Sequence, residues 1–225
     1  MTRRLTTIGA VLLVAAVHAM AQSAVQQAVQ QAAAENKQKL LQYQWIETSQ
    51  LTLNGDAKPP TQNLCRYGPD GQVQKTPLGA PPPAPSGGRL KQRVIEKKTA
   101  EIKDYMGDVK GLISTYVPPD PQKLQQAFAA GKVSLNPAGG VVNVIFTDYV
   151  QAGDRMTLTF DTAAKKIVSL NINTYMGQEK DAVTLQVQMA SLPDGTNYAQ
   201  QTTLNATAKK LVVTTTSASY QKLGN

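Results

Sequence analysis

Histidine and cysteine are almost absent from this sequence of 225 residues, which contains one of each. The histidine, His18, falls in an N-terminal segment that we expect to be removed, so the mature chain would lack the commonest general base and metal ligand. The single cysteine, Cys65, excludes an internal disulfide. We expect Cys65 to be a small buried apolar residue rather than a reactive thiol, because its basic neighbour Arg66 points to the other face of a strand.

Motifs for catalysis are missing as well. The sequence has no nucleophile elbow, phosphate loop, dinucleotide fingerprint or metal-binding pattern, so we predict no catalytic residues, no metal and no cofactor, and no enzymatic activity. Glu47 and Asp148 are the only acids within predicted strands, and they form the one pair worth inspecting for acid-pair hydrolysis. A structural role for each is the preferred interpretation.

Long apolar runs are lacking too. Residues 1–21 combine the basic Arg3 and Arg4 with a short apolar run from Ile8 to Val17 and the small-residue motif Ala19-Met20-Ala21. A membrane-spanning helix needs roughly 20 apolar residues. We therefore predict a signal peptide cleaved after Ala21 rather than an anchor, a periplasmic or secreted location, and a single mature domain over residues 22–225.

The charge is positive, and the formal value of +8 would fall to +6 on loss of Arg3 and Arg4. Such a charge favours anionic partners in general, and peripheral contact with an anionic membrane surface is one possibility for an exported protein. Aromatic residues make up only 5% of the sequence, and no nucleic-acid motif is present. We therefore predict no nucleic-acid partner.

Helical patterns occupy two parts of the chain. Residues 22–41 have apolar residues at helical spacing, and residues 89–131 form a helical insertion whose first helix is strongly charged. That helix either packs on a sheet with a solvated outer face, which is the preferred interpretation, or lies on a membrane surface. Between the two parts, residues 77–88 contain five prolines and are predicted to be a linker, with a recognition segment as the alternative.

Period-two alternation dominates the remaining sequence and predicts antiparallel strands. Tyr43, Trp45, Leu51 and Leu53 share one face of a strand that ends at the turn signal Asn54-Gly55. After residue 140 a meander follows, with an apolar strand over 141–150 and later strands that alternate apolar residues with Thr, Asn and Gln. This pattern predicts an α+β fold whose polar sheet face is either solvated or lines a concave cavity.

The order of these elements resembles one known superfamily. A helix runs directly into a strand over residues 35–53, and a long meander ends with residues 181–223. This order is similar to that of the periplasmic lipoprotein carriers, the LolA-like and LolB-like proteins. The resemblance implies a curved antiparallel sheet, an incomplete barrel, with helices packed on one side and a cavity for acyl chains between them. The proline-rich segment and the charged helix depart from that pattern.

The leading hypothesis is therefore a carrier-like or binding protein that holds an apolar, lipid-like ligand between the sheet and its helices. The alternative is a non-catalytic interaction module of the cell envelope with a filled core, which would explain the same apolar positions. The predicted ligand-binding residues are Trp45, Leu51, Phe128, Met156, Leu158, Phe160, Leu170, Ile172, Leu185, Val187 and Met189.

Overall fold

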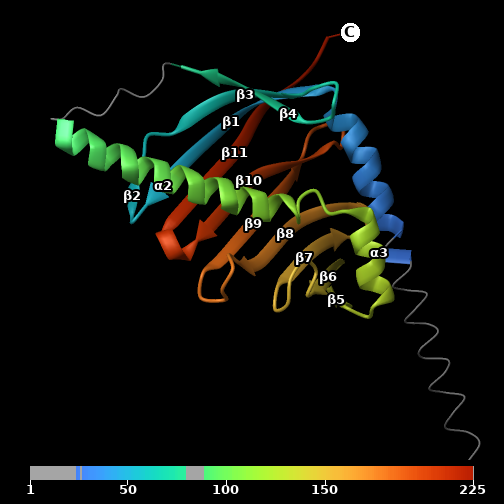
Figure 1. The fold of residues 1–225 in the computed structure, drawn as a ribbon. Helices are drawn as coiled ribbons and strands as arrows, with labels where there is room; N and C mark the ends of the chain where they lie inside the picture. Colours follow the sequence, from blue (N-terminus) through green and yellow to red (C-terminus); the bar gives the residue numbers. More distant parts are fainter. Residues whose placement is uncertain (1–23, 26, 80–88, 225) are drawn as a thin grey trace, which may run out of the picture.

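The computed structural model describes residues 24, 25, 27–79 and 89–224 (Figure 1). The predicted signal peptide and most of the predicted linker, residues 80–88, lie outside these ranges. Within these ranges the chain forms three helices and one eleven-stranded antiparallel sheet, so the predicted α+β class is confirmed. The sheet does not close into a barrel, because β4 and β5 lie at its two ends without pairing to each other.

The first described element is a helix over residues 27–40, to which residues 24 and 25 also belong. The other helices are α2 (Arg89–Ser114) and α3 (Pro121–Ala129), with a short 3-10 turn, η1 (Thr207–Lys209). The strands are β1 (Tyr43–Leu53), β2 (Asp56–Ala57), β3 (Thr61–Tyr67), β4 (Val73–Leu78), β5 (Val133–Ala138), β6 (Val141–Thr147), β7 (Arg155–Asp161), β8 (Lys166–Tyr175), β9 (Ala182–Ser191), β10 (Asn197–Ala206) and β11 (Leu211–Lys222).

Strands from the N-terminal and C-terminal parts of the chain pair with each other in the sheet. Its strand order is β4-β3-β1-β11-β10-β9-β8-β7-β6-β5, with β2 attached to β1, so the first long strand lies between β3 and the final strand. Glu47 of β1 is directly opposite Ser217 of β11, and Leu53 is opposite Leu211. The N-terminal hairpins and the C-terminal meander therefore form one continuous surface.

Local sequence signals explain several element boundaries. Asn54 and Gly55 have φ values of 53° and 87°, as the tight turn between β1 and β2 requires. The Asp120 side chain accepts hydrogen bonds from the backbone N–H groups of Gln122, at 2.7 Å, and Lys123, and Pro121 occupies the first helical position of α3. Both features match their predictions.

One predicted strand was too long, and one strand was missed. The strand predicted over residues 141–150 ends at Thr147, because Asp148 adopts a left-handed φ of 49° and its carboxylate accepts a 2.8 Å hydrogen bond from Gly153 N–H. Strand β5, which includes Pro137, was not predicted. It lies at an edge of the sheet, where a missing backbone N–H is tolerated. The predicted linker also begins too early, since Pro77 and Leu78 belong to β4.

The sheet is strongly curved, and the three helices lie on its concave side (Figure 1). Helix α2 crosses the open side of the sheet, with Val109 fully buried on its inner face and residues 97–101 exposed. This arrangement agrees with the preferred interpretation of a helix packed on the sheet. Among the described helices, none has a stretch long and apolar enough to span a bilayer.

Candidate ligand groove

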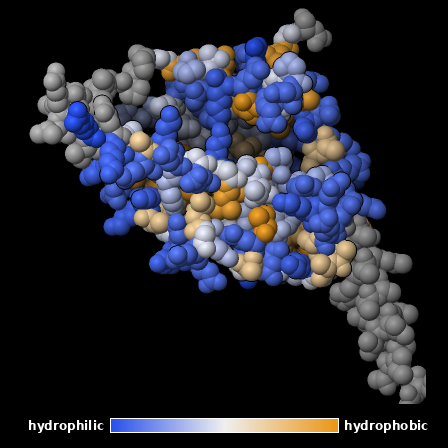
Figure 2. Space-filling model, viewed as in Figure 1, coloured by the Kyte–Doolittle hydropathy of each residue, from blue (hydrophilic) through white to orange (hydrophobic). Residues whose placement is uncertain are grey.

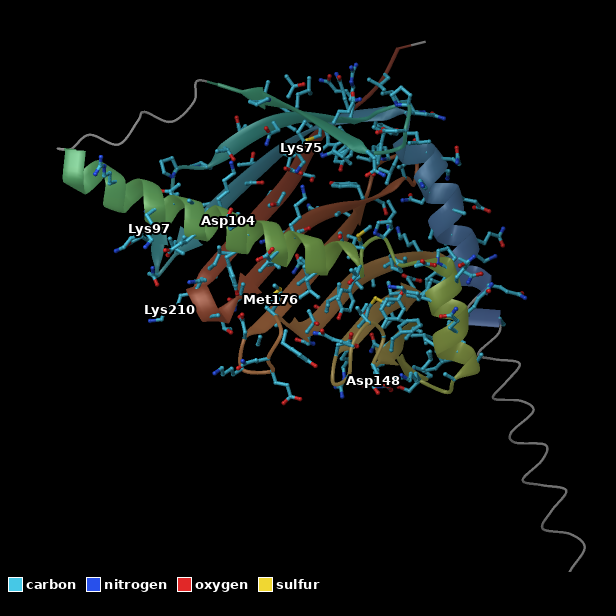
Figure 3. All side chains as sticks on the ribbon, in the orientation of Figure 1. Lys75, Lys97, Asp104, Asp148, Met176 and Lys210 are labelled. Atoms are coloured by element: carbon cyan, nitrogen blue, oxygen red, sulfur yellow. The ribbon has the colours of Figure 1, made fainter. Side chains whose placement is uncertain are left out.

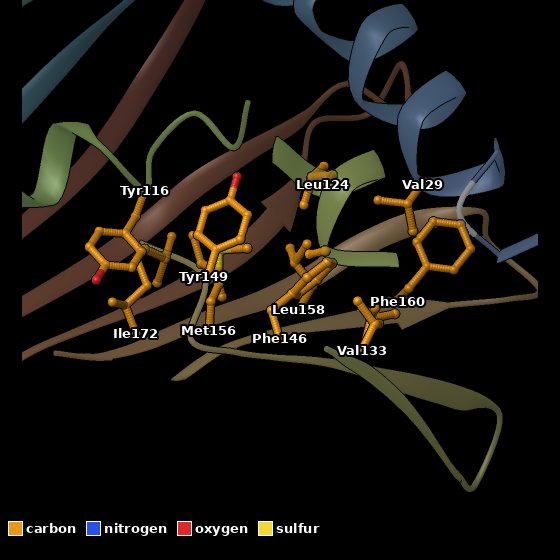
Figure 4. Packing of buried hydrophobic residues seen from close by; sticks show 14 of the residues in the cluster. Val29, Tyr116, Leu124, Val133, Phe146, Tyr149, Met156, Leu158, Phe160 and Ile172 are labelled. Carbon is orange, nitrogen blue, oxygen red and sulfur yellow. The ribbon is translucent and has the colours of Figure 1, made fainter. Parts of the chain in front are cut away.

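One half of the concave face is a packed apolar core. Seven predicted ligand-binding residues are buried in it: Met156, Leu158, Phe160, Leu170, Ile172, Leu185 and Val187. Val29 of the N-terminal helix and Leu124 of α3 point onto these strands (Figure 4), and Phe128 and Met189 pack at the margin. The void remaining beside Val29, Phe128 and Leu158 is only about 10 Å³. In the described structure, side chains of the protein itself occupy the space around these residues.

A second apolar cluster lies beneath α2. Val109 meets Val183, Ala206 and Leu211 at the ends of β9, β10 and β11, and the predicted residue Leu51 packs at its margin. The Tyr105 hydroxyl donates a 2.9 Å hydrogen bond to Asp181 Oδ1. Burial, followed by this bond, raises the pKa of Tyr105 to about 12. These contacts fix the second half of α2 against the sheet.

The other half of the concave face is open. Strand pairing shows that it continues the same surface, because the core residue Val187 is opposite Thr202, which is opposite Thr215. A groove of about 220 Å³ lies here, and Figure 2 shows the molecule hollowed between α2 and the strands β3 and β4. We call it the aromatic groove; its lining is Leu40, Trp45, Glu47, Tyr67, Val73, Lys75, Tyr198, Ala199, Thr202, Thr215, Ser217 and Tyr220.

Four aromatic rings form one wall of the aromatic groove. The indole of Trp45 stacks on Tyr220, with ring centroids 5.5 Å apart and an interplanar angle of 10°, and Tyr67 lies 5.4 Å from the same indole. Tyr198 lies 4.4 Å from Tyr220. Burial raises the pKa values of Tyr67 and Tyr220 above their usual range. Tyr67 and Tyr220 therefore stay uncharged near pH 7, and the wall presents electron-rich ring faces.

A charged pair lies beside the rings. The Lys75 ammonium is paired with Glu47 Oε1, and the Ser49 hydroxyl also lies near this oxygen. Glu47 extends from β1, between two paired strands, and its side chain is 12% exposed, whereas Lys75 lies on the edge strand β4 and is 47% exposed. Figure 3 places Lys75 above α2, over the strands that form the groove. The groove thus contains one fixed carboxylate and one cation with access to solvent.

Cys65 lies beneath this pair. It is directly opposite Trp45 on β1 and Lys75 on β4, and it is completely buried. Burial raises the pKa of the Cys65 thiol, and the negative charge of Glu47 raises it further. Both effects oppose thiolate formation, in keeping with the prediction of a buried apolar residue.

Glu47 and Asp148, the one acid pair that the sequence left open, lie far apart in the sheet. Glu47 lies on β1, whereas Asp148 lies in the loop after β6, and five strands separate β1 from β6 in the sheet. Asp148 was also wrongly placed within a strand. Among the described residues, no group of three or more Cys, Asp or Glu side chains could hold a metal ion. The fold therefore does not bring Glu47 and Asp148 together for acid-pair hydrolysis.

Sequence reasoning found only part of the aromatic groove. Trp45 is the one predicted ligand-binding residue that lines it; of the other ten, nine belong to the packed core and Leu51 to the cluster under α2. Tyr67, Lys75, Tyr198 and Tyr220 were missed. The sequence contained one indication of this site. Glu47 is a charged residue on the same face of β1 as Tyr43 and Trp45, where the alternation would otherwise place an apolar side chain.

The similarity of this chain to known proteins lies in its structure and not in its sequence. No family model matches the sequence, and no curated protein matches it. A protein of the DUF1329 family from Desulfovibrio piger is 8% identical with a TM-score of 0.43, covering 89% of this chain and 92% of that one. A protein domain of the outer membrane lipoprotein-sorting type from Vibrio parahaemolyticus is 10% identical with a TM-score of 0.40, covering 89% and 94%. A lipoprotein-sorting domain is thus among the solved structures similar to this chain.

Proposed function

We propose that this protein is a non-catalytic binding protein that holds a small amphipathic, lipid-like ligand in the aromatic groove. The observation that carries the proposal is the contrast within one concave face. The half packed against the N-terminal helix and α3 retains a void of about 10 Å³, whereas the half lined by β1, β3, β4, β10 and β11 retains about 220 Å³. Ligand sites favour concave, largely apolar surfaces with a few polar groups, and the aromatic groove has this composition.

The lining suits a ligand with both apolar and polar parts. Leu40, Val73 and Ala199 join the four rings as apolar contacts, while Thr202, Thr215 and Ser217 offer hydroxyl groups. The volume is below the roughly 300 Å³ typical of sites for drug-sized molecules. A single narrow chain or ring therefore fits better than a bulky multi-chain lipid.

Binding is favoured over catalysis because the groove lacks a catalytic arrangement. Among the described lining residues, Glu47 is the single carboxylate and is paired with Lys75, and none is a histidine. The predicted signal peptide also indicates where the protein would act. The mature protein would act in the periplasm or outside the cell, where lipid-like molecules are available at membrane surfaces.

The only tryptophan of the chain lies in the groove wall and provides a direct probe. We would titrate the protein with an uncharged amphiphile that carries a brominated decyl chain, because bromine quenches indole emission at contact. Saturable quenching of Trp45 supports the proposal. Native mass spectrometry of freshly purified protein would show whether a lipid is retained.

A matched pair of variants locates the binding. Thr202→Phe fills the groove, whereas Thr203→Phe adds the same ring to the opposite face of the same strand. We expect quenching to be lost in the first variant and kept in the second. Equal quenching in both, or none in the unmodified protein, would contradict the proposal.

The second candidate is an interaction module of the cell envelope. The observation in its favour is the packed core at nine of the eleven predicted ligand-binding positions. In that case the groove would be empty of small molecules, and no amphiphile would quench Trp45.

A further inference from the structure

The ion pair in the aromatic groove has one fixed member and one exchangeable member. Glu47 lies on an internal strand with only 12% of its side chain exposed, so its carboxylate cannot turn to bulk water without leaving the groove. Lys75 lies on an edge strand with 47% of its side chain exposed. A long lysine side chain at such a position can extend its ammonium into solvent at little cost. Departure of Lys75 would leave a buried carboxylate that needs another cation.

The aromatic rings that line the groove together with Glu47 favour a cation as well. Trp45 is on the same strand as Glu47, Tyr67 is on the adjacent strand β3, and Tyr220 of β11 stacks on Trp45. Aromatic faces carry partial negative charge, and a cation within about 6 Å of a ring centre gains roughly 0.5–2 kcal/mol. Quaternary ammonium groups are recognised in this way because they are bulky, weakly hydrated and unable to donate hydrogen bonds.

We infer that the aromatic groove receives the positively charged head of its ligand, a quaternary ammonium or a protonated amine, which replaces Lys75 at Glu47. This inference rests on the proposed function and names the ligand class within it. The apolar part of the ligand would lie against the rings and Ala199. Lys75 acts as a stand-in cation that keeps Glu47 neutralised while the groove is empty.

An anionic head fits the groove less well. Lys75 is the only Lys or Arg in the described lining, and any anion bound to it would lie beside the Glu47 carboxylate. Because Glu47 cannot withdraw, the anion would be repelled by Glu47 and by the electron-rich ring faces. The charges of the groove therefore select for a cation, although the chain as a whole is basic.

Three amphiphiles that share a decyl chain test the inference: a trimethylammonium, a sulfate and an uncharged maltoside, each below its micelle concentration. The readout is the emission of Trp45. We expect the trimethylammonium form to bind at least about tenfold more tightly than the maltoside, which corresponds to about 1.4 kcal/mol. The sulfate should bind most weakly.

Variants of the two charged residues sharpen the test. Glu47→Gln should reduce the preference for the trimethylammonium form by about tenfold while the maltoside still binds, and Lys75→Gln should strengthen cation binding several-fold by removing the competitor. Glu101→Gln and Lys97→Gln make the same charge changes on the exposed part of α2 and should alter neither value. Unchanged denaturation midpoints would show that all four variants are folded.

The outcomes separate the two proposals. Equal binding of the three amphiphiles, or tightest binding of the sulfate, would overturn the cation inference and leave the binding function standing. Absence of any saturable response would overturn both. A cation preference that Glu47→Gln leaves intact would also reject the inference, since the selectivity would then come from elsewhere.

Discussion

The Tyr116 hydroxyl donates a 2.6 Å hydrogen bond to Asp154 Oδ2 in the interior of the protein. Tyr116 follows α2, and Asp154 ends the loop between β6 and β7, so the bond ties the end of the crossing helix to the sheet. The same carboxylate accepts hydrogen bonds from the backbone N–H groups of Tyr149, Val150 and Gln151. Thr174 on β8 lies 2.8 Å from the Tyr116 hydroxyl.

Removal of this bond should destabilise the fold. Hydrogen bonds to charged groups contribute roughly 1.5–3 kcal/mol, so we expect Tyr116→Phe to lower the free energy of unfolding by about that amount. Asp154→Ala should cost more, because it leaves several buried donors without an acceptor. Tyr175→Phe is the control: its hydroxyl donates to Ala152 O at an exposed site. Urea denaturation measures all three, and equal midpoints for the Phe variants would refute the prediction.

We expect alkaline pH to lower the free energy of unfolding. Burial raises the pKa values of Tyr67, Tyr116, Tyr149 and Tyr220, and that of Tyr105 rises to about 12. A folded-state pKa above the unfolded value of about 10 means that the stabilisation is complete below pH 10 and is lost as the pH rises beyond it. Urea midpoints should therefore be constant between pH 8 and pH 9.5 and then fall, with a smaller fall in Tyr116→Phe. Midpoints unchanged at pH 11.5 would be inconsistent with these buried phenols.

Acid should weaken a different contact. The Tyr43 hydroxyl donates to Asp194 Oδ2 at 2.7 Å, and this bond, with the backbone N–H of Thr196, holds the pKa of Asp194 well below its usual range. A lowered carboxyl pKa stabilises the folded state above about pH 4, and the contribution disappears as the pH falls further. Asp194→Asn should therefore flatten the decline of the thermal midpoint between pH 5 and pH 2.

A matched variant separates this contact from general charge effects. Asp104→Asn removes one exposed carboxylate from α2 and should leave the acid profile close to that of the unmodified protein. If both variants flatten the profile equally, net charge rather than the Tyr43–Asp194 bond controls acid stability.

A larger side chain introduced into the packed core tests whether that half of the concave face has room for a ligand. Leu185 is buried in the packed core, so Leu185→Trp should cost about 1–3 kcal/mol of stability. Gln186→Trp places the same ring on the exposed face of β9 and should be close to neutral. Urea midpoints measure both. A neutral Leu185→Trp with a lost amphiphile response would show that the ligand enters the core, and would return the site to the positions predicted from sequence.

Local features of the fold were predictable because each depends on adjacent residues. The Asn54-Gly55 turn, the Asp120 cap and the alternation of β8 and β9 all follow from side-chain chemistry within a few positions. Asp148 was mispredicted because apolar neighbours suggested a continued strand, whereas its carboxylate organises a turn with Gly153. Short-range patterns cannot distinguish these outcomes when a strand end carries a turn-forming residue.

The candidate groove was not predictable in the same way. It requires β1 to pair with β11, which places Trp45 beside Tyr220, and β4 to fold back so that Lys75 reaches Glu47. Alternation shows that a strand has two faces, but it does not show which face is concave or which half the helices cover. The long-range strand order determines both properties.

The pairing of β1 with β11 also determines when the aromatic groove can form during folding. Strands β1 and β3 emerge early during synthesis and can pair with each other, yet the second long neighbour of β1 is β11, Leu211–Lys222. Contacts between such distant residues form slowly, because a long chain must be ordered before the pairing contributes. The incomplete chain can form hairpins but not the Trp45–Tyr220 wall. If the groove binds ligand as proposed, a chain that lacks the docked final strand would be unable to take it up.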